Sequence, residues 1–188
     1  MCDCGGRPFI SPVAGDAIRP LCRLCRVDSF SFARARSYAV YNDALHGAIL
    51  LLKYEEVTRL GDWFSPKLAE VVARDADGFR ADVVVPVPLH GDRMRERGYN
   101  QADLIARPPA RLLKLKTGSY LLTRRKPRPA RLVLSRKEHW DSVRGASATR
   151  EGVQVDNLRV LLVDDVLTTA RLLIRVLALY RRPAQKPC

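Results

Sequence analysis

The sequence predicts an α/β fold in which a parallel sheet is flanked by helices. Two runs, DVVVPVP from Asp82 to Pro88 and RVLLVDD from Arg159 to Asp165, are apolar at consecutive positions instead of alternating ones. This pattern is typical of strands that are covered on both faces, as in a parallel sheet. Parallel neighbours need crossover connections, which are usually helical. The segment from Ala102 to Leu113 is a candidate for such a helix.

Three further elements are expected before the first of these strands. Ala35 to Tyr41 has the tyrosines and the valine of a short strand. Ala44 to Tyr54 has apolar residues at helical spacing, which predicts an amphipathic helix. A second helix is expected to start at Ser65 and Pro66, because serine caps free amides and proline fits a first helical turn. It is expected to break between Ala76 and Phe79.

Length and composition limit the class of protein. The chain has 188 residues, of which 47% are hydrophobic, enough for one domain with a core and a small appendage. No apolar run approaches the length that spans a bilayer, so we expect no membrane insertion. The first residues lack a basic region that leads into an apolar stretch, and this predicts no signal peptide. We therefore expect a cytoplasmic protein with reduced cysteines.

The cysteines divide the chain into two expected units. Residues 1–28 hold four of the five cysteines, in the pairs Cys2/Cys4 and Cys22/Cys25, and residues 29–188 form the larger domain. Two such pairs suggest four thiolates around a zinc ion, and the spacing of the second pair is the usual one for a zinc knuckle. The alternative is that these are reduced thiols without metal. Cys188 lies on a polar tail and is expected to be a free thiol.

Positive charge is concentrated in one segment. The formal net charge of the chain is +13, and the stretch from Arg107 to Arg144 is rich in Lys and Arg, with Glu138 and Asp141 as its acidic residues. Such a segment attracts polyanions, either nucleic acid or a phosphate-rich small molecule. A solvated basic loop is the alternative interpretation.

The most informative motif is RVLLVDDVLTT, from Arg159 to Thr169. A buried strand ends in two carboxylates, which are followed by a turn with two hydroxyls and an expected helix. Ligands of open α/β sheets bind at the carboxyl ends of strands, and a turn that enters a helix offers backbone N–H groups to a phosphate. Asp164 and Asp165 would repel the phosphate, so they suit ribose hydroxyls or a Mg²⁺ ion. Plain helix capping is the alternative.

The motif LLVDDVLTT resembles the phosphoribosyl-diphosphate (PRPP) motif of type I phosphoribosyltransferases, and the wider pattern resembles the ComF family of competence proteins. Other segments follow the order of that family: the cysteine-bearing N-terminus, KYEEVTRLGDW from Lys53, PVPLHGDRMRERGYNQADLIAR from Pro86, and LSRKEHWDSVRGA from Leu134. The resemblance implies a type I phosphoribosyltransferase-like sheet with a small zinc-ribbon-like module at its N-terminus.

The resemblance also implies roles for residues. Asp164 and Asp165 would be the catalytic carboxylates, and the turn that follows would bind the PRPP phosphate. The loop after the first core strand would hold the pyrophosphate, and a flexible loop would close over the site. The phosphate-binding residues would be Val166, Leu167, Thr168, Thr169 and Ala170; those for pyrophosphate His90, Arg93, Arg97 and Gly98, with Arg95 nearby; and those of the flexible loop Ser135, Arg136 and Arg144.

The chain departs from the family pattern in three ways. Ala170, Arg171 and Leu172 stand where the family has Gly followed by Ala-Thr, and that glycine lets the backbone approach the phosphate closely. The chain then ends in RRPAQKPC without the apolar strand that the family has next, so we expect a truncated or altered C-terminus. His139 and Ser142 stand where the family has Arg and Asn.

Two functions are compatible with these features. The first is phosphoribosyl transfer from PRPP with Mg²⁺, or binding of another sugar phosphate at the same site. The second is a non-catalytic competence factor that holds single-stranded DNA on the basic surface during natural transformation, with helicase-type competence proteins as partners. The acceptor substrate cannot be read from the sequence.

Overall fold

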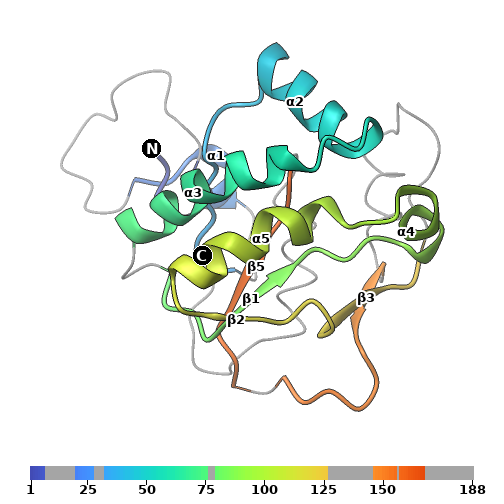
Figure 1. The fold of residues 1–188 in the computed structure, drawn as a ribbon. Coiled ribbons are helices and arrows are strands. Elements are labelled where there is room, and N and C mark those ends of the chain that lie inside the picture. Colours follow the sequence, from blue (N-terminus) through green and yellow to red (C-terminus); the bar gives the residue numbers. More distant parts are fainter. Residues whose placement is uncertain (7–19, 28–31, 76–78, 127–145, 156, 168–188) are drawn as a thin grey trace.

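The structure is a computed structural model that describes residues 1–6, 20–27, 32–75, 79–126, 146–155 and 157–167. Helices precede and connect the strands of an α/β unit (Figure 1). The helices are α1 (Arg23–Val27), α2 (Asp43–Tyr54), α3 (Arg59–Arg74), α4 (Gly91–Arg97) and α5 (Gln101–Leu112). The strands are β1 (Val83–Pro86), β2 (Lys116–Thr117), β3 (Leu122–Arg124), β4 (Ser147–Thr149) and β5 (Val160–Val163).

The central sheet has the predicted parallel arrangement. Its strand order is β2-β1-β5, and both pairings are parallel. Strand β1 lies in the middle, with Val83 opposite Val160 and Pro86 opposite Val163. The crossover from β1 to β2 runs through α5, as the sequence predicts for residues 102–113. Strands β3 and β4 form a separate antiparallel pair.

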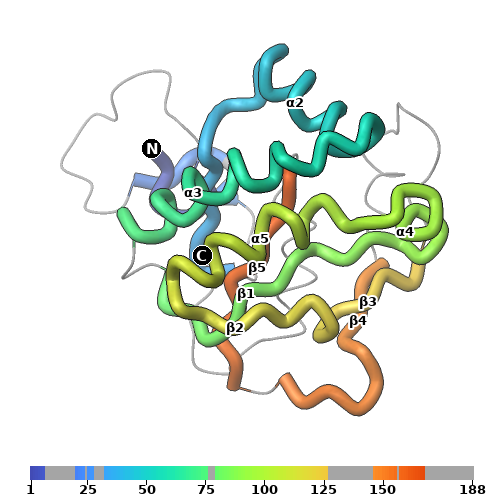
Figure 2. Tube along the Cα trace, in the orientation of Figure 1, coloured from blue at the N-terminus to red at the C-terminus, as the bar shows by residue number. Residues whose placement is uncertain are grey.

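Both faces of the sheet are covered at β1 and β5, which is why these two strands are apolar at every position. Val84 and Val163 face one core cluster, together with residues of α2, α3 and α5. Val83 and Val85 face the other cluster, with Leu121, Leu122 and Val155. Figure 2 shows α5 next to the sheet, α3 beyond it and α2 outermost on the same side. The prediction of strands buried on both faces is therefore confirmed.

Helix α3 begins earlier than the sequence analysis expects. It starts at Arg59, so Ser65 and Pro66 lie inside the helix and do not form its first turn. Proline cannot donate a backbone hydrogen bond. The Ser65 hydroxyl, which is fully buried, instead lies within hydrogen-bond reach of the Gly61 and Ile105 carbonyls. Packing against α5 thus outweighs the local start signal, and the expected helix start at Ser65 is wrong.

The segment before α2 also differs from its prediction. Residues 35–41 form bends and coil, and the strand expected from Ala35 to Tyr41 is wrong. Its tyrosines and valine are largely exposed, and the segment pairs with no strand among the described residues. Strand propensity is expressed only where a partner strand and a buried surface are present. Helix α2 follows as predicted, and the Asn42 side chain caps it by accepting a hydrogen bond from the Leu45 N–H.

Two further expectations concern loops and membranes. Pro127 and Pro129 predict a loop from Arg124 to Arg131. Arg124 is instead the last residue of β3, and the part of this segment from residue 127 onward lies outside the described residues. Across the described part of the chain, every helix is too short or too polar to cross a bilayer.

Candidate functional site

Two adjacent carboxylates follow the last strand of the sheet. Strand β5 ends at Val163, and Asp164 and Asp165 come directly after it, at the edge where the carboxyl ends of β1 and β5 meet. The Asp164 Oδ1 atom accepts a hydrogen bond of 2.9 Å from the Asp165 backbone N–H. The Asp165 side chain is only 6% exposed. The fold therefore places a partly buried acid, Asp164, and a buried carboxylate, Asp165, at the end of a parallel strand, where open α/β sheets bind ligands.

The proximity of the two acids changes the proton affinity of one of them. Burial of the Asp164 carboxyl, together with the negative charge of Asp165, raises the pKa of Asp164 to about 8. The Asp165 backbone N–H and the Lys53 ammonium act in the opposite direction but are outweighed. Close pairs of carboxylates with one strongly raised pKa are characteristic of sites that bind cations or transfer protons.

Lys53 supplies the positive charge at this site. It lies in the last turn of α2, and its ammonium forms an ion pair with the Asp165 Oδ2 atom. The Lys53 side chain is 15% exposed, so this pair is largely withdrawn from water. Lys53 begins a segment that resembles the ComF family, but its sequence context predicts no role for it. One signal was available: Lys53 follows the buried Ile49 by four residues and so shares the buried face of α2.

The segment after β1 is held against the same edge. The Val87 N–H donates to the Val163 carbonyl at 2.8 Å, and the Asn100 side-chain amide donates to the Val87 carbonyl at 3.0 Å. Asn100 also caps α5, as its side chain accepts a hydrogen bond from the Ala102 N–H. The Tyr99 hydroxyl donates to the Leu52 carbonyl. Residues 99 and 100 thus connect the ends of α2 and β1 to the start of α5.

The residues expected to hold pyrophosphate lie on α4 and at its ends. The Nδ1 atom of His90 accepts a hydrogen bond from the Asp92 N–H and so caps the helix. Arg93 pairs with Glu96, at 2.6 Å, and Arg95 pairs with Asp92, both within α4. These local ion pairs occupy the guanidinium groups that the sequence analysis expects on a diphosphate.

Arg97 and Gly98 complete that segment. Arg97 hydrogen-bonds to the Gln101 side chain and lies over the Tyr54 ring, with 5.3 Å between guanidinium carbon and ring centroid. Gly98 ends α4 in a left-handed conformation with φ of 77°, which glycine adopts without steric cost. Arg97 is the arginine of α4 that contacts the end of α2, next to Lys53.

The expected phosphate turn is described only at its start. Val166 packs against the core cluster of α2, α3 and α5, and Leu167 is partly exposed. Thr168, Thr169 and Ala170 lie outside the described residues, as do the flexible-loop residues Ser135, Arg136 and Arg144. Their expected roles remain predictions.

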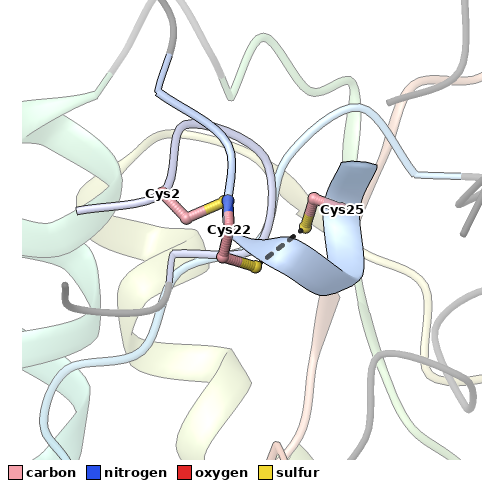
Figure 3. A group of neighbouring side chains, drawn as sticks. All are labelled: Cys2, Cys22 and Cys25. Carbon is pink, nitrogen blue, oxygen red and sulfur yellow. Dashed lines mark hydrogen bonds between the residues drawn. The ribbon is translucent and has the colours of Figure 1, made fainter. Parts of the chain in front are cut away.

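Three of the four expected zinc ligands come together at the N-terminus. The Sγ atoms of Cys2, Cys22 and Cys25 all lie within 4.8 Å of one another (Figure 3). The Cys22 and Cys25 sulfurs are 3.6 Å apart. Cys4 is buried in the same small cluster, with Phe32 and Ala35, but is not one of the three grouped sulfurs.

The Cys2 and Cys25 thiols differ in proton affinity. Burial by itself would raise the pKa of Cys2, but hydrogen bonds from the Cys22 and Gly5 N–H groups and from the neighbouring thiols outweigh it and lower that pKa. Burial, with the adjacent Cys22 and Cys2 sulfurs, raises the pKa of Cys25 to about 12. Thiolates are the species that bind zinc. Cys2 therefore ionises more readily than an ordinary thiol, whereas a metal ion would have to deprotonate Cys25.

An ion-pair network joins this cysteine group to the α/β unit. The Arg34 guanidinium lies 3.1 Å from Asp3, which is flanked by Cys2 and Cys4, and it also pairs with Asp75 after α3. Arg36 lies 2.9 Å from the same Asp75 carboxylate and donates to the Asp3 carbonyl at 2.8 Å. These contacts hold the N-terminal residues against the end of α3.

Taken together, the described residues define an α/β protein with a parallel sheet, a carboxylate pair at the end of β5 and a cysteine group near its N-terminus. No protein-family profile matches the chain, and no solved structure matches it. Curated relatives do. Competence protein F of Haemophilus influenzae is 33% identical over 102 residues, which cover 54% of this chain and 44% of that protein.

Two other curated relatives also match the chain. Competence protein ComFC of Bacillus subtilis is 28% identical over 112 residues, 56% of this chain and 43% of the relative. DNA utilization protein YhgH of Escherichia coli K12 is 29% identical over 164 residues, 86% of this chain and 71% of the relative. The chain is thus related to the ComF family. The matches to the first two relatives span less than half of those proteins' length.

Proposed function

We propose that this chain is a phosphoribosyltransferase-like protein that binds PRPP or another ribose 5-phosphate compound together with Mg²⁺, in the service of natural transformation. The carboxylate pair at the end of β5 is the observation that supports the proposal. Its place at the carboxyl edge of a parallel sheet suits a sugar phosphate, and the relatives named for competence suggest the biological setting.

The oxygen atoms at this edge suit a Mg²⁺ ion. Magnesium is bound in proteins through one or two carboxylates while substrate phosphates and waters complete its octahedron. Asp164 and Asp165 offer such carboxylates, and the Asp165 oxygen already faces a cationic group, Lys53. When bound, Mg²⁺ would neutralise charge on the diphosphate of the ligand. The protein's own contribution is to hold both acids at the strand end in a largely buried setting.

The decisive experiment is a calorimetric titration with PRPP, in the presence and absence of Mg²⁺. The wild-type chain should bind PRPP only with Mg²⁺. The double variant Asp164→Asn with Asp165→Asn should lose this binding while its circular dichroism spectrum stays unchanged. As a control, Asp62→Asn with Glu70→Gln removes two acidic groups from the exposed face of α3 and should bind like wild type. Unchanged PRPP affinity in the Asp164/Asp165 variant would contradict the assignment.

A second candidate function is binding of single-stranded DNA by the basic end of β3. Arg125 and Lys126 are exposed there, and a relative that this chain matches over 164 residues is named for DNA utilization. Phosphate contacts release counterions, so affinity should fall by roughly 0.7 log units per contact for each tenfold rise in salt. Replacing Arg125 and Lys126 by serine should reduce that slope by about 1.4. The test is a titration of the wild type and the serine variant with single-stranded DNA at several salt concentrations. A slope near zero for the wild type excludes DNA binding through these residues.

A further inference from the structure

We propose that Lys53 is a positioning residue whose ammonium group neutralises Asp165 in the free protein. When ligand binds, a divalent cation replaces this ammonium group at Asp165. The inference rests on the proposed function, because it concerns the same carboxylate. It adds a residue that acts through Asp165 and a physical account of how the buried carboxylate is stabilised in the free protein.

The ion pair between Lys53 and Asp165 is largely buried. The side chains of Asp165 and Lys53 are 6% and 15% exposed, so neither charge is well hydrated. A carboxylate this deeply buried requires a partner, because an unpaired buried charge is strongly destabilising. Lys53 is the cation that contacts Asp165 within the described residues. Removing the Lys53 charge should therefore leave Asp165 as an unpaired buried carboxylate, which another cation would stabilise.

The surroundings of Lys53 make its side chain the movable part. The residue before it is fixed, because the Leu52 carbonyl accepts a hydrogen bond from the Tyr99 hydroxyl and the Leu52 side chain is fully buried. The residue after it, Tyr54, lies under the Arg97 guanidinium. The end of α2 is thus held on both sides of Lys53. The lysine side chain has a flexible four-carbon stem, so it can leave Asp165 while the helix stays in place.

Lys53 and a metal ion should compete for Asp165, because both are positively charged. A divalent cation bound to the Asp165 oxygen that Lys53 now contacts would lie close to the ammonium group, and two cations at that distance repel each other strongly when water is scarce. Mg²⁺ must therefore displace the lysine from Asp165. The lysine accordingly holds the carboxylate in place before ligand arrives and weakens the binding of Mg²⁺ alone.

The test compares Lys53→Met with Lys53→Arg, with Mg²⁺ alone as the probe. In EDTA, Lys53→Met should melt at a lower temperature than wild type. Mg²⁺ should restore most of that loss and should bind Lys53→Met about tenfold more tightly than wild type by calorimetry, since the repelling charge is gone. Lys53→Arg keeps the charge and should resemble wild type. Should Lys53→Met fail to fold in EDTA, Lys53→Gln is titrated in the same way with the same expectation.

Two controls separate this role from a merely structural one. Lys116→Met removes an exposed lysine from β2 and should leave both the melting temperature and the Mg²⁺ response unchanged. Lys53→Met combined with Asp165→Asn removes both charges, so it should recover part of the lost melting temperature and lose the enhanced Mg²⁺ response. Both results support a charge effect on Asp165, and an Mg²⁺ response that persists in this double variant opposes it.

The outcomes also distinguish this proposal from the proposed function. If wild type binds PRPP with Mg²⁺ but Lys53→Met binds Mg²⁺ no more tightly than wild type, the role of Lys53 is refuted and the PRPP site stands. If wild type binds no PRPP under any condition, the proposed function fails. In that case tighter Mg²⁺ binding by Lys53→Met would still identify Asp165 as a cation site that Lys53 occupies.

Discussion

Replacing Asp164 by asparagine should flatten the dependence of stability on pH. Burial and the neighbouring Asp165 raise the pKa of the Asp164 carboxyl from 3.8 to about 8 in the folded protein. The folded state therefore binds this proton more tightly than the unfolded state does. The resulting stabilisation is fully present below about pH 4 and is lost as pH rises towards 8. Stability of the wild-type chain should fall across this window.

The size of the effect follows from the shift. Each pH unit inside the window corresponds to about 1.4 kcal/mol for a single group. Between pH 6 and pH 9 the free energy of unfolding should therefore fall by about 2 kcal/mol, a value reduced to allow for solvent screening of this partly exposed residue. For a chain of this size that corresponds to roughly 4–8 °C in melting temperature.

The assay is thermal unfolding followed by circular dichroism at several pH values, without divalent cations. The asparagine side chain of the Asp164→Asn variant is neutral at every pH, and its oxygen can still accept the hydrogen bond from the Asp165 N–H. The difference between the two melting curves isolates Asp164 from cysteines and other groups that titrate in the same range. If the melting temperatures of wild type and Asp164→Asn change in parallel from pH 6 to pH 9, the raised pKa is wrong.

Two other predictions concern the N-terminal residues. Protein purified under reducing conditions should contain up to about one zinc ion per chain, lost in Cys22→Ser with Cys25→Ser and kept in Cys188→Ser; metal analysis that finds none in wild type rejects the site. Gly6→Ala should lower the free energy of unfolding by about 1–3 kcal/mol in urea, because Gly6 has φ of 63° and a Cβ atom there would lie 2.5 Å from the Ala35 carbonyl oxygen. Gly152→Ala is its control: φ is 77° but the space around it is open, so equal losses would show that the contact with Ala35 is irrelevant.

Local sequence patterns were sufficient for the central strands and for the start of α5. The consecutive apolar residues of β1 and β5 reflect burial on both faces, which is a property of each strand by itself. Asn100 is a good cap in any context, and α5 begins immediately after it. The same reasoning placed Asp164 and Asp165 at a strand end, since their position depends only on where β5 stops.

Where a local signal competed with packing, prediction failed. The tyrosines and valine of residues 35–41 have strand propensity, yet no strand forms because none of the described strands lies beside them. Ser65 and Pro66 have the chemistry of a helix start, yet the contact between α3 and α5 extends the helix to Arg59. In both cases the outcome depended on whether a segment distant in sequence packs against the residues in question.

The sequence by itself therefore determined the class of fold, the strand that carries the acids and the cysteine pairs. Only the tertiary structure decided which groups meet. Lys53 reaches Asp165 because α2 packs over α3 and α5 on one side of the sheet. The arginines of α4 engage the acids of their own helix, and the Cys2 sulfur meets those of Cys22 and Cys25. Periodicity and spacing describe a segment, whereas such contacts depend on how separate segments bury one another's surface, and no pattern within a segment specifies that partner.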